Sequence, residues 1–423
     1  WNFGIYRKRD GSALWRGPPD PLLLPEWPAG EPDLDAFAAC LANGLERRGW
    51  RVQHRLVADQ SARCLDFSPP PDPDCASGQL QKSVPLTLAL LTADLSEGCP
   101  PAAQIDLPAL ASVRLCLSLL DCLAESALAC QLPALVIAGE SPPVDDTVEL
   151  TTITPDPAVI EVNTAPSVHA VEFLARSRAI YGAAAQLGLT PYRLYFNGAV
   201  ADSGGGGQIT LGGPSPNASP FVIEPRLLPR LVRFLNRHPS LSYLYSHDFV
   251  GSGGQSARAD ERGTGAFDEL ALTLALLDRQ EPLEAGMLWE SLAPFLCDGA
   301  GNNHRAEINI EKLFNPTQSG RSQLGLVEFR ALRMQHTPER ATALACLLRA
   351  IVAMLASAQE LPLIDWGREL HDRFALPYYL SQDLQSVLEE LTRAGLGLGE
   401  HIEAVLWREE FRFWAALSLP GCT

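Results

Sequence analysis

The sequence predicts an α+β protein built around a largely antiparallel sheet. Short segments that alternate apolar and polar side chains, the pattern of strands with one buried face, recur along the chain. Longer segments with apolar residues at helical spacing lie among them, without the regular strand–helix alternation of a parallel sheet. With 423 residues, 46% of them hydrophobic, the chain can bury a sizeable core.

The first part, residues 1–65, is expected to form a small α+β region. "WNFGIYRKRDG" alternates like a strand and turns at Asp10-Gly11, and apolar side chains follow at helical spacing from Leu34 to Arg48. The Pro-rich stretch "DFSPPPDPDCASGQLQ", residues 66–81, is the best candidate for a linker. Residues 82–423 would then form a second, larger domain.

This larger part mixes predicted strands and helices. Strand patterns occur in "SVPLTLALLTADL", "ALVIAGE", "YRLYFNG", "NNHRAEINIEKL" and "GLVEFRAL", and a hairpin pattern in "DTVELTTITPDPAVIEVN". Helices are predicted at about 107–131, 168–187, 224–239, 266–279, 338–358 and 366–376, with more toward the end of the chain. "GSGGQSARADERGTG", residues 251–265, is predicted to be a polar loop.

Charge and cysteine content exclude several classes of protein. The net charge of -17 argues against electrostatic binding to nucleic acid or to an anionic membrane. The ten cysteines form no C-x-x-C pair, and several lie in apolar runs, so buried free thiols are expected. We find no apolar run long enough to span a membrane and no signal peptide, which predicts a soluble cytoplasmic protein. Since the sequence opens on Trp1 without a Met, its native N-terminus is expected to be missing.

Three strand-like segments each carry a glutamate with a polar partner two residues later. They are Glu161-Val162-Asn163, Glu307-Ile308-Asn309 and Glu328-Phe329-Arg330, and Arg305 extends the second. Residues i and i+2 of a strand lie on one face, so each segment offers an apolar face to a core and a polar face outward. A solvated face of an antiparallel sheet is the alternative explanation for any one of them.

If these strands share a sheet, three carboxylates converge and need a cation among them. Oxygen ligands suit Mg²⁺ or Mn²⁺, which predicts a site made by Glu161, Asn163, Glu307 and Glu328. Arginines suit phosphate oxygens, so Arg305 and Arg330 are candidate catalytic residues for phosphoryl transfer.

Further candidates come from two loops. "SGGGGQ" could bring backbone amides close to a phosphate, which makes Gly205, Gly206, Gly207 and Gln208 candidate nucleotide-binding residues; a flexible turn is the alternative. Candidate substrate-binding residues, for which solvated or structural roles are the alternative, are Arg258 and Arg262 in the second loop, Asn309 and His304. The same choice is open for His371, Asp372 and Arg373 in "WGRELHDRFALP".

Several motifs in one order resemble an amidoligase family that is often joined to a transglutaminase-like domain. They are "TPDPAVIEVN", "HPSLSYLYS", "GNNHRAEINIEKLFNP", "GLVEFRAL" and "WGRELHDRFALP", with "WNFGIYRKRDGSALWR" at the start. The resemblance is strong from about residue 150 to 380 and thin between 30 and 145.

The resemblance implies a catalytic domain similar to glutamine synthetase and glutamate–cysteine ligase. Such enzymes hold Mg²⁺ on an antiparallel sheet lined with glutamates, phosphorylate a carboxylate with ATP, and let an amine displace the phosphate. It therefore implies an ATP- and Mg²⁺-dependent carboxylate–amine ligase acting on a peptide or amino-acid substrate, with Glu161, Glu307 and Glu328 as metal ligands and a transglutaminase-like or other ligase protein as a partner.

The chain departs from the family pattern at two positions. Gly207-Gln208 stands where relatives usually show Asn-His, and Ala165 stands where a His is common. The chain also ends at Thr423, where relatives are expected to continue, so the domain is expected to be truncated. Two alternatives therefore remain: a degenerate ligase that binds a peptide or partner domain, and a metal-dependent amidase that activates water. The arginines argue against the amidase.

Overall fold

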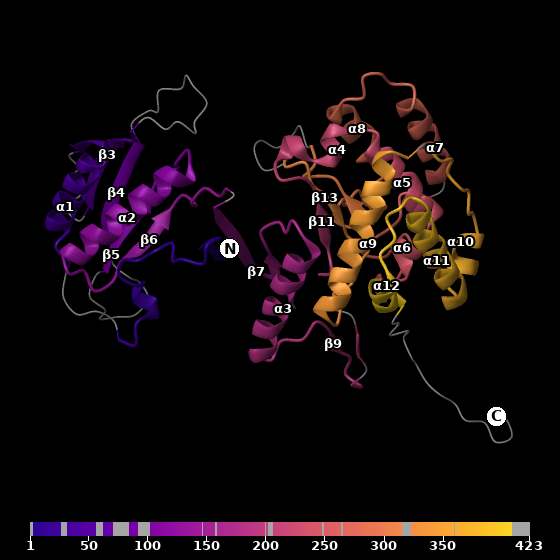
Figure 1. Ribbon diagram of the computed structural model, residues 1–423, viewed down its shortest axis with the longest axis horizontal. Helices are drawn as coiled ribbons and strands as arrows, with labels where there is room; N and C mark the ends of the chain where they lie inside the picture. The colour runs from indigo at the N-terminus through magenta and orange to yellow at the C-terminus, as the bar shows by residue number, and fades with distance from the viewer. Residues whose placement is uncertain are drawn as a thin grey trace. The chain divides into compact units, whose positions relative to one another are not determined.

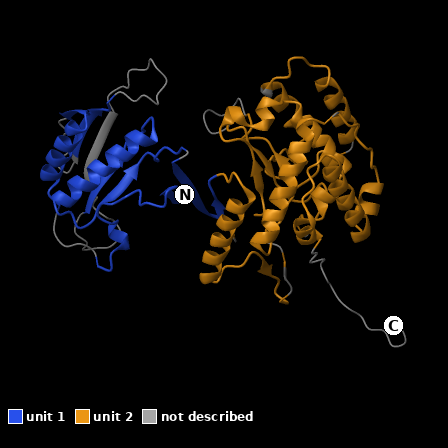
Figure 2. Ribbon diagram, in the orientation of Figure 1, with its two compact units in different colours: residues 1–156, 160–165 blue, residues 157–159, 166–423 orange. Residues whose placement is uncertain are grey.

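The computed structural model describes residues 3–26, 32–55, 62–70, 84–91, 102–145, 147–156, 159–198, 200–201, 206–247, 249–263, 265–314, 323–358 and 360–407. The chain divides into two compact units (Figures 1 and 2). Unit 1 comprises residues 1–156 and 160–165, and unit 2 comprises residues 157–159 and 166–423. Each unit has its own buried apolar cluster, so each is described by itself.

Unit 1 holds a five-stranded sheet in the order β2-β3-β4-β5-β6, in which the β5–β6 pair is parallel and the other pairs are antiparallel. A second sheet has the order β1-β7-β8. The elements of unit 1 are β1 (Phe3–Lys8), a 3-10 turn (Pro21–Leu23), α1 (Leu34–Arg47), β2 (Arg51–Arg55), β3 (Ala62–Ser68), β4 (Val84–Leu91), β5 (Ala102–Leu107), α2 (Val113–Ala129), β6 (Val136–Gly139), β7 (Val148–Asp156) and β8 (Val159–Asn163).

Helices α1 and α2 pack together in the core of unit 1. Asp33 caps α1 by accepting a hydrogen bond from the Ala36 amide at 2.9 Å, and Ser112 caps α2 in the same way. Gly44 lies where the helices meet, since a Cβ there would come within 2.7 Å of Cys122 Sγ. Cys122 is one of seven described cysteines, all of them free thiols as predicted.

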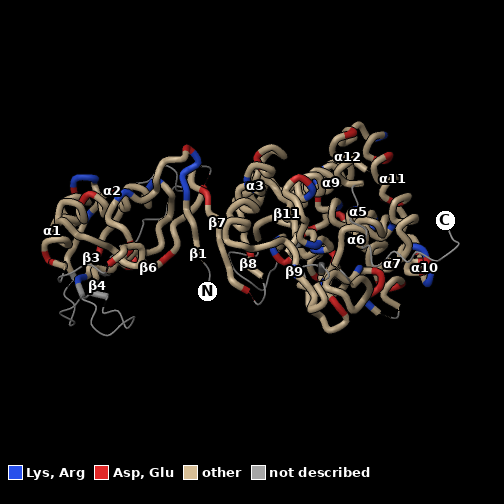
Figure 3. Tube along the Cα trace, turned by 90° about the horizontal axis from the view of Figure 1, so that it is seen from below, with Lys and Arg blue, Asp and Glu red and all other residues tan. Residues whose placement is uncertain are grey.

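Unit 2 is mainly helical around one small sheet. Its elements are α3 (Ala170–Gln186), β9 (Arg193–Leu194), β10 (Val200–Ala201), β11 (Ile209–Leu211), a 3-10 turn (Pro216–Ala218), α4 (Pro220–Ile223), α5 (Leu227–Arg237), α6 (Ser240–Tyr243), α7 (Ala266–Leu277), α8 (Ala285–Leu292), β12 (Ile308–Asn309), β13 (Val327–Phe329), α9 (Pro338–Ala356), α10 (Glu369–Phe374), α11 (Pro377–Arg393) and α12 (Glu400–Trp407). Figure 3 shows acidic and basic positions interspersed along these elements.

The sheet of unit 2 has the order β11-β13-β12 and is antiparallel throughout. Helix α9, which Thr337 caps and Pro338 begins, contributes a row of buried leucines to the same core as the sheet. The predicted α+β class is therefore confirmed. A membrane span is not among these elements: no described helix is both long and apolar enough to cross a bilayer.

Two predicted boundaries differ from the structure. The stretch 66–81, predicted as a linker, begins inside β3 (Ala62–Ser68), and β3 pairs with β4 in one sheet of unit 1. Residues 71–83 lie outside the described part of the chain. The helix predicted at 107–131 begins only at Val113, since Ala102–Leu107 form strand β5. Because β5 and α2 are both strongly apolar, the sequence did not show where the two-residue repeat of a strand gives way to the 3.6-residue repeat of a helix.

Candidate functional site

The small sheet of unit 2 has one apolar and one polar face, as the alternating pattern predicted. Ile209, Ile308, Val327 and Phe329 are all buried in the core. On the other face, Glu328 of the central strand lies directly between Thr210 of β11 and Asn309 of β12. Side chains at paired positions of antiparallel strands share a face. The polar residues of three distant segments are thus brought together.

Glu328 and Arg330 form an ion pair on this face. Arg330 Nη1 lies 3.2 Å from Glu328 Oε1, and Arg330 Nε donates to the His304 carbonyl at 2.9 Å. The two side chains are 13% and 16% exposed. The guanidinium is therefore held by two partners in a fixed orientation while still reaching solvent.

Glu307, the next candidate, is enclosed. It accepts hydrogen bonds from Ser242 Oγ at 2.6 Å and from the Ala259 amide at 3.2 Å, and lies 3.9 Å from Arg258 Nη1. Its side chain is 3% exposed. Burial raises the pKa of Glu307, although the Arg258 charge and the two donors act the other way.

Arg258 corrects our expectation of a substrate-binding arginine. It is fully buried, and its five N–H groups all have acceptors: both carboxylate oxygens of Asp260, the carbonyls of Leu235 and Asn236, and Ser242 Oγ. Burial works against its charge, but Asp260 and Glu307 outweigh it and raise the pKa of Arg258. A substrate has no free donor to bind here, so the role of Arg258 is structural.

The predicted sharing of one sheet by three glutamates is wrong. Glu161 lies in β8, in the β1-β7-β8 sheet of unit 1, where Asn163 Nδ2 donates to its Oε1 at 2.8 Å. Asn309 is used locally, donating to the Asn303 carbonyl and accepting from the Glu311 amide. Within the described ranges, no group of three or more His, Cys, Asp or Glu side chains could hold a metal ion. Glu161 and Asn163 thus lie in unit 1, and Glu307 and Glu328 lie in unit 2.

Arg305 and His304 precede the strand because β12 is only two residues long. Arg305 Nη2 donates to the carbonyls of Gly253 and Gly254 at 2.9 and 3.2 Å, and its Nε lies 3.6 Å from Asp298. His304 is 65% exposed, 3.5 Å from Glu311. Arg305 thus fixes the loop at 253–254.

The two segments "ADERG" and "WGRELHDRF" meet at Glu261. Its Oε2 accepts from Tyr243 Oη at 2.6 Å and lies 3.3 Å from His371 Nε2, and the Tyr243 and His371 rings stack. Burial raises the pKa of Tyr243, and the neighbouring Glu261 adds to this. Arg262 points elsewhere, donating to the Pro294 carbonyl and lying over the Phe295 ring.

The chain matches the model of one protein family. The model of the family described as "Putative amidoligase enzyme (DUF2126)" matches residues 83–418, well over half of the chain. The chain belongs to this amidoligase family. The resemblance predicted from the sequence motifs is thereby confirmed. Neither a curated protein nor a solved structure gave a match.

Packing explains the two described glycines of the glycine run, Gly206 and Gly207. Gly206 forms an antiparallel bridge with Arg333, and a Cβ on Gly207 would come within 1.9 Å of the Arg333 carbonyl oxygen. Gly205 lies outside the described residues. Gln208 is half-buried and, if the β11–β13 register continues by one residue, faces Arg330. A nucleotide-binding role for this loop stays a prediction.

Sequence reasoning missed the polar residues that surround the sheet. Ser242, Tyr243 and Asn236 lie in apolar helical segments, where a single polar residue gives no signal of its own. Asn236 donates to Asp260 at 2.7 Å and to the Ile364 carbonyl, while its carbonyl accepts from Trp366. Only the fold reveals that Ser242 and Asn236 bind Arg258 and Asp260, and that Tyr243 binds Glu261.

Proposed function

We propose that this chain is an ATP-dependent carboxylate–amine ligase that joins a peptide or amino-acid carboxylate to an amine. Membership of the amidoligase family carries the proposal. We place the reaction over the polar face of β11–β13–β12, where Glu328 and Arg330 reach solvent above a buried apolar layer. Groups supported by a rigid core in this way are held in the fixed geometry that catalysis needs.

The chemistry explains why ATP is part of the proposal. A carboxylate is a poor electrophile, so it must first be activated. A carboxylate oxygen of the substrate attacks the γ-phosphorus of ATP, and the bond to ADP breaks. The amine nitrogen then attacks the acyl carbon, the bond from that carbon to the phosphate oxygen breaks, and the nitrogen loses a proton. The products are an amide, ADP and phosphate.

Arg330 is the proposed catalytic cation. Negative charge builds up on the phosphoryl oxygens during both transfers, and a positioned guanidinium stabilises it. The Glu328 carboxylate and the His304 carbonyl hold two edges of the Arg330 guanidinium, which fixes its plane. Its planar fork matches phosphate oxygens in a way that an ammonium group does not.

Mg²⁺ or Mn²⁺ enters the proposal only with the nucleotide. Magnesium sites commonly consist of one or two carboxylates together with substrate phosphates and water. Glu328, which is partly exposed, fits such a site, whereas Glu307 and Asn309 do not because their oxygens are committed. When bound, the ion would neutralise phosphate charge. Membership of the family is also our reason to propose a glutamine synthetase-like arrangement of the catalytic domain and a transglutaminase-like or other ligase protein as a partner.

The test is formation of an amide together with ADP. The protein is incubated with ATP, Mg²⁺ and a panel of amino acids and short peptides, with hydroxylamine as a general amine that converts acyl phosphates to hydroxamates. We expect ADP and hydroxamate in equal amounts, dependent on the carboxylate. Arg330→Lys should remove both products, while Arg373→Lys, on the exposed side of α10, should remove neither.

A second candidate is a ligase-type domain that binds its ligand without turnover. The commitment of Glu307 to Ser242, Ala259 and Arg258 favours it, because a metal-binding glutamate of an active enzyme should keep its oxygens available. Binding of an ATP analogue without ADP release for any carboxylate would indicate this candidate. Cleavage of amides without ATP would indicate an amidase instead.

A further inference from the structure

Arg258 connects the sheet to a small pocket on another part of unit 2. One side of Arg258 faces Glu307, and its other partner, Asp260, lines the pocket. The pocket has a volume of about 210 Å³, and its described lining comes from two segments: Asp260, Glu261, Gly263, Gly265, Ala266 and Phe267 in one, and Asp365, Trp366, Gly367, Leu370 and His371 in the other. Sites that enclose a drug-sized ligand measure roughly 300–1,000 Å³. This pocket therefore suits a head group and not a whole nucleotide.

Glu261 borders this pocket with an unsatisfied carboxylate oxygen. Its side chain is 8% exposed, and its Oε2 is engaged by Tyr243 and His371. Its Oε1 is buried and has no hydrogen-bond partner among the residues that the structure describes. A buried carboxylate oxygen without a donor is costly. The missing partner is expected to be a donor, preferably a charged one, that enters with a ligand.

The composition of the pocket wall selects a cation. Asp260, Glu261 and Asp365 line it, and the described lining contains no Lys or Arg. Phe267 and Trp366 add aromatic rings, which attract cations electrostatically. The first turn of α7 also borders the pocket, but a helix N-terminus carries only about half a positive charge. Asp260 is paired with Arg258, so the negative charge that faces the pocket comes from Glu261 and Asp365.

We propose that this pocket binds a primary ammonium group and serves as the amine subsite of the ligase. The second clause rests on the proposed function; the first does not. The loop at 251–254 links the two places, since a Cβ at Gly251 would lie 3.7 Å from His371 while Gly253 and Gly254 hold Arg305. The proton that the ammonium must lose passes to Glu261, next to His371, which is 54% exposed.

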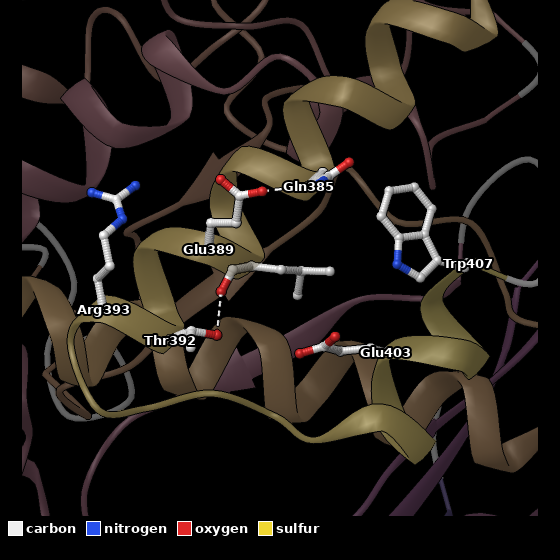
Figure 4. Close-up of a pocket in the computed structure, with 7 residues that line it drawn as sticks. Gln385, Glu389, Thr392, Arg393, Glu403 and Trp407 are labelled. Atoms are coloured by element: carbon white, nitrogen blue, oxygen red, sulfur yellow. Dashed lines mark hydrogen bonds between the residues drawn. The ribbon is translucent and has the colours of Figure 1, made fainter.

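A larger pocket on α11 and α12 provides the matched control. It measures about 630 Å³ and holds two glutamates, Glu389 and Glu403 (Figure 4). Glu389, however, accepts a hydrogen bond from Gln385 at 2.9 Å, and Arg393 lines the same pocket. Because Glu389 already has a hydrogen-bond donor and a nearby cation, we expect it to bind an ammonium group less well than Glu261, whose Oε1 has no donor among the residues that the structure describes.

The experiment is titration of n-butylammonium into the full chain at low salt and about pH 8, above the usual pKa of an imidazole. 1-Butanol serves as the neutral ligand. Wild type should bind the ammonium and not the alcohol. Glu261→Gln, which keeps the shape but not the charge, should weaken binding about 10- to 100-fold, as expected for a charged hydrogen bond. Glu389→Gln should leave it unchanged.

Equal affinity for wild type and a folded Glu261→Gln variant, or equal affinity for amine and alcohol, would overturn the proposal. Should Glu261→Gln fail to fold, the NMR signals of the His371 ring in wild type are followed instead while n-butylammonium is added. A change in their chemical shifts supports the site, and unchanged chemical shifts overturn it. ADP release is measured separately. Ammonium binding without ADP release refutes the ligase and keeps the site, whereas ADP release without ammonium binding does the reverse.

Discussion

Two glutamate–arginine pairs, Glu307–Arg258 and Glu328–Arg330, lie at the small sheet of unit 2, and they differ in burial and in the number of their partners. Glu307 and Arg258 are 3% and 0% exposed, and every donor of Arg258 has an acceptor. Glu328 and Arg330 are 13% and 16% exposed and have few partners. The Glu307–Arg258 pair therefore stabilises the fold, whereas the Glu328–Arg330 pair remains accessible to a ligand. The difference lies in how many of their hydrogen-bonding groups already have partners within the protein.

The largest effect is expected from Arg258→Met. The change leaves Asp260 and Glu307 buried without their cation, and removal of one partner from a buried pair costs about 3–5 kcal/mol. Urea unfolding measures the loss. Arg373→Met, at a side chain that is 48% exposed, is the control and should change stability by less than about 0.5 kcal/mol. A small loss at Arg258 would mean that the two pairs are equivalent.

Arg330→Lys should show the opposite profile. If Arg330 binds phosphate as proposed, loss of its planar fork should lower the rate of ADP release about 100- to 1,000-fold, the range seen when one transition-state donor is removed. Stability should change little because the side chain is partly exposed. The rate is followed by a coupled assay and the fold by thermal unfolding. Wild-type turnover would remove Arg330 from the mechanism.

Gly207→Ala tests whether the glycine run is part of the support. The new Cβ would meet the Arg333 carbonyl at 1.9 Å, so the strand ends must shift at a cost of about 1–3 kcal/mol. Gly253→Ala is a suitable control, since nothing lies within 4 Å of a Cβ there. Urea unfolding compares the two variants. Equal stability would leave phosphate contact as the better explanation of Gly207.

The smallest effect concerns pH. The pKa of Glu307 is raised above its usual 4.5 in the folded state, so the folded chain holds this proton more tightly than the unfolded chain. The resulting stability is complete below pH 4.5 and is lost as pH rises through the folded pKa. Glu307→Gln carries no such proton, so wild type should lose stability relative to this variant as pH rises above 4.5. A constant difference in unfolding free energy across pH would contradict this.

The sequence predicted the fold where periodicity was local. Leu34, Phe37, Leu41 and Leu45 identified α1 within one residue, because their spacing alone determines the buried face. It also predicted the two faces of the strand around Glu328. It could not predict that β12 would have only two residues, or that Arg305, which precedes it, would bind Asp298 and the carbonyls of Gly253 and Gly254.

The sequence predicted which types of residue form the candidate site, but it did not predict which of those residues lie together or which already have partners. A Glu-x-polar pattern does not reveal whether its partners lie in the same sheet, and Glu161 belongs to another. The pattern also does not show which carboxylates are already satisfied. Ser242, the Ala259 amide and Arg258, all distant in sequence, decide that for Glu307. That Glu261 lies beside His371 could not be predicted either, because the two residues are far apart in the sequence.

The central position of β13 has a consequence for how the protein becomes competent. Phe329 pairs with Ile308 and also with Ile209, which precedes it by far more of the chain. Closing so long a segment carries a large entropic cost, and such non-local pairing forms late in folding. A growing chain cannot assemble the Glu328 face until residue 329 has been synthesised. The charged pair therefore forms only after β11 and β12 have been made, and a chain that ends before β13 has no such pair to expose.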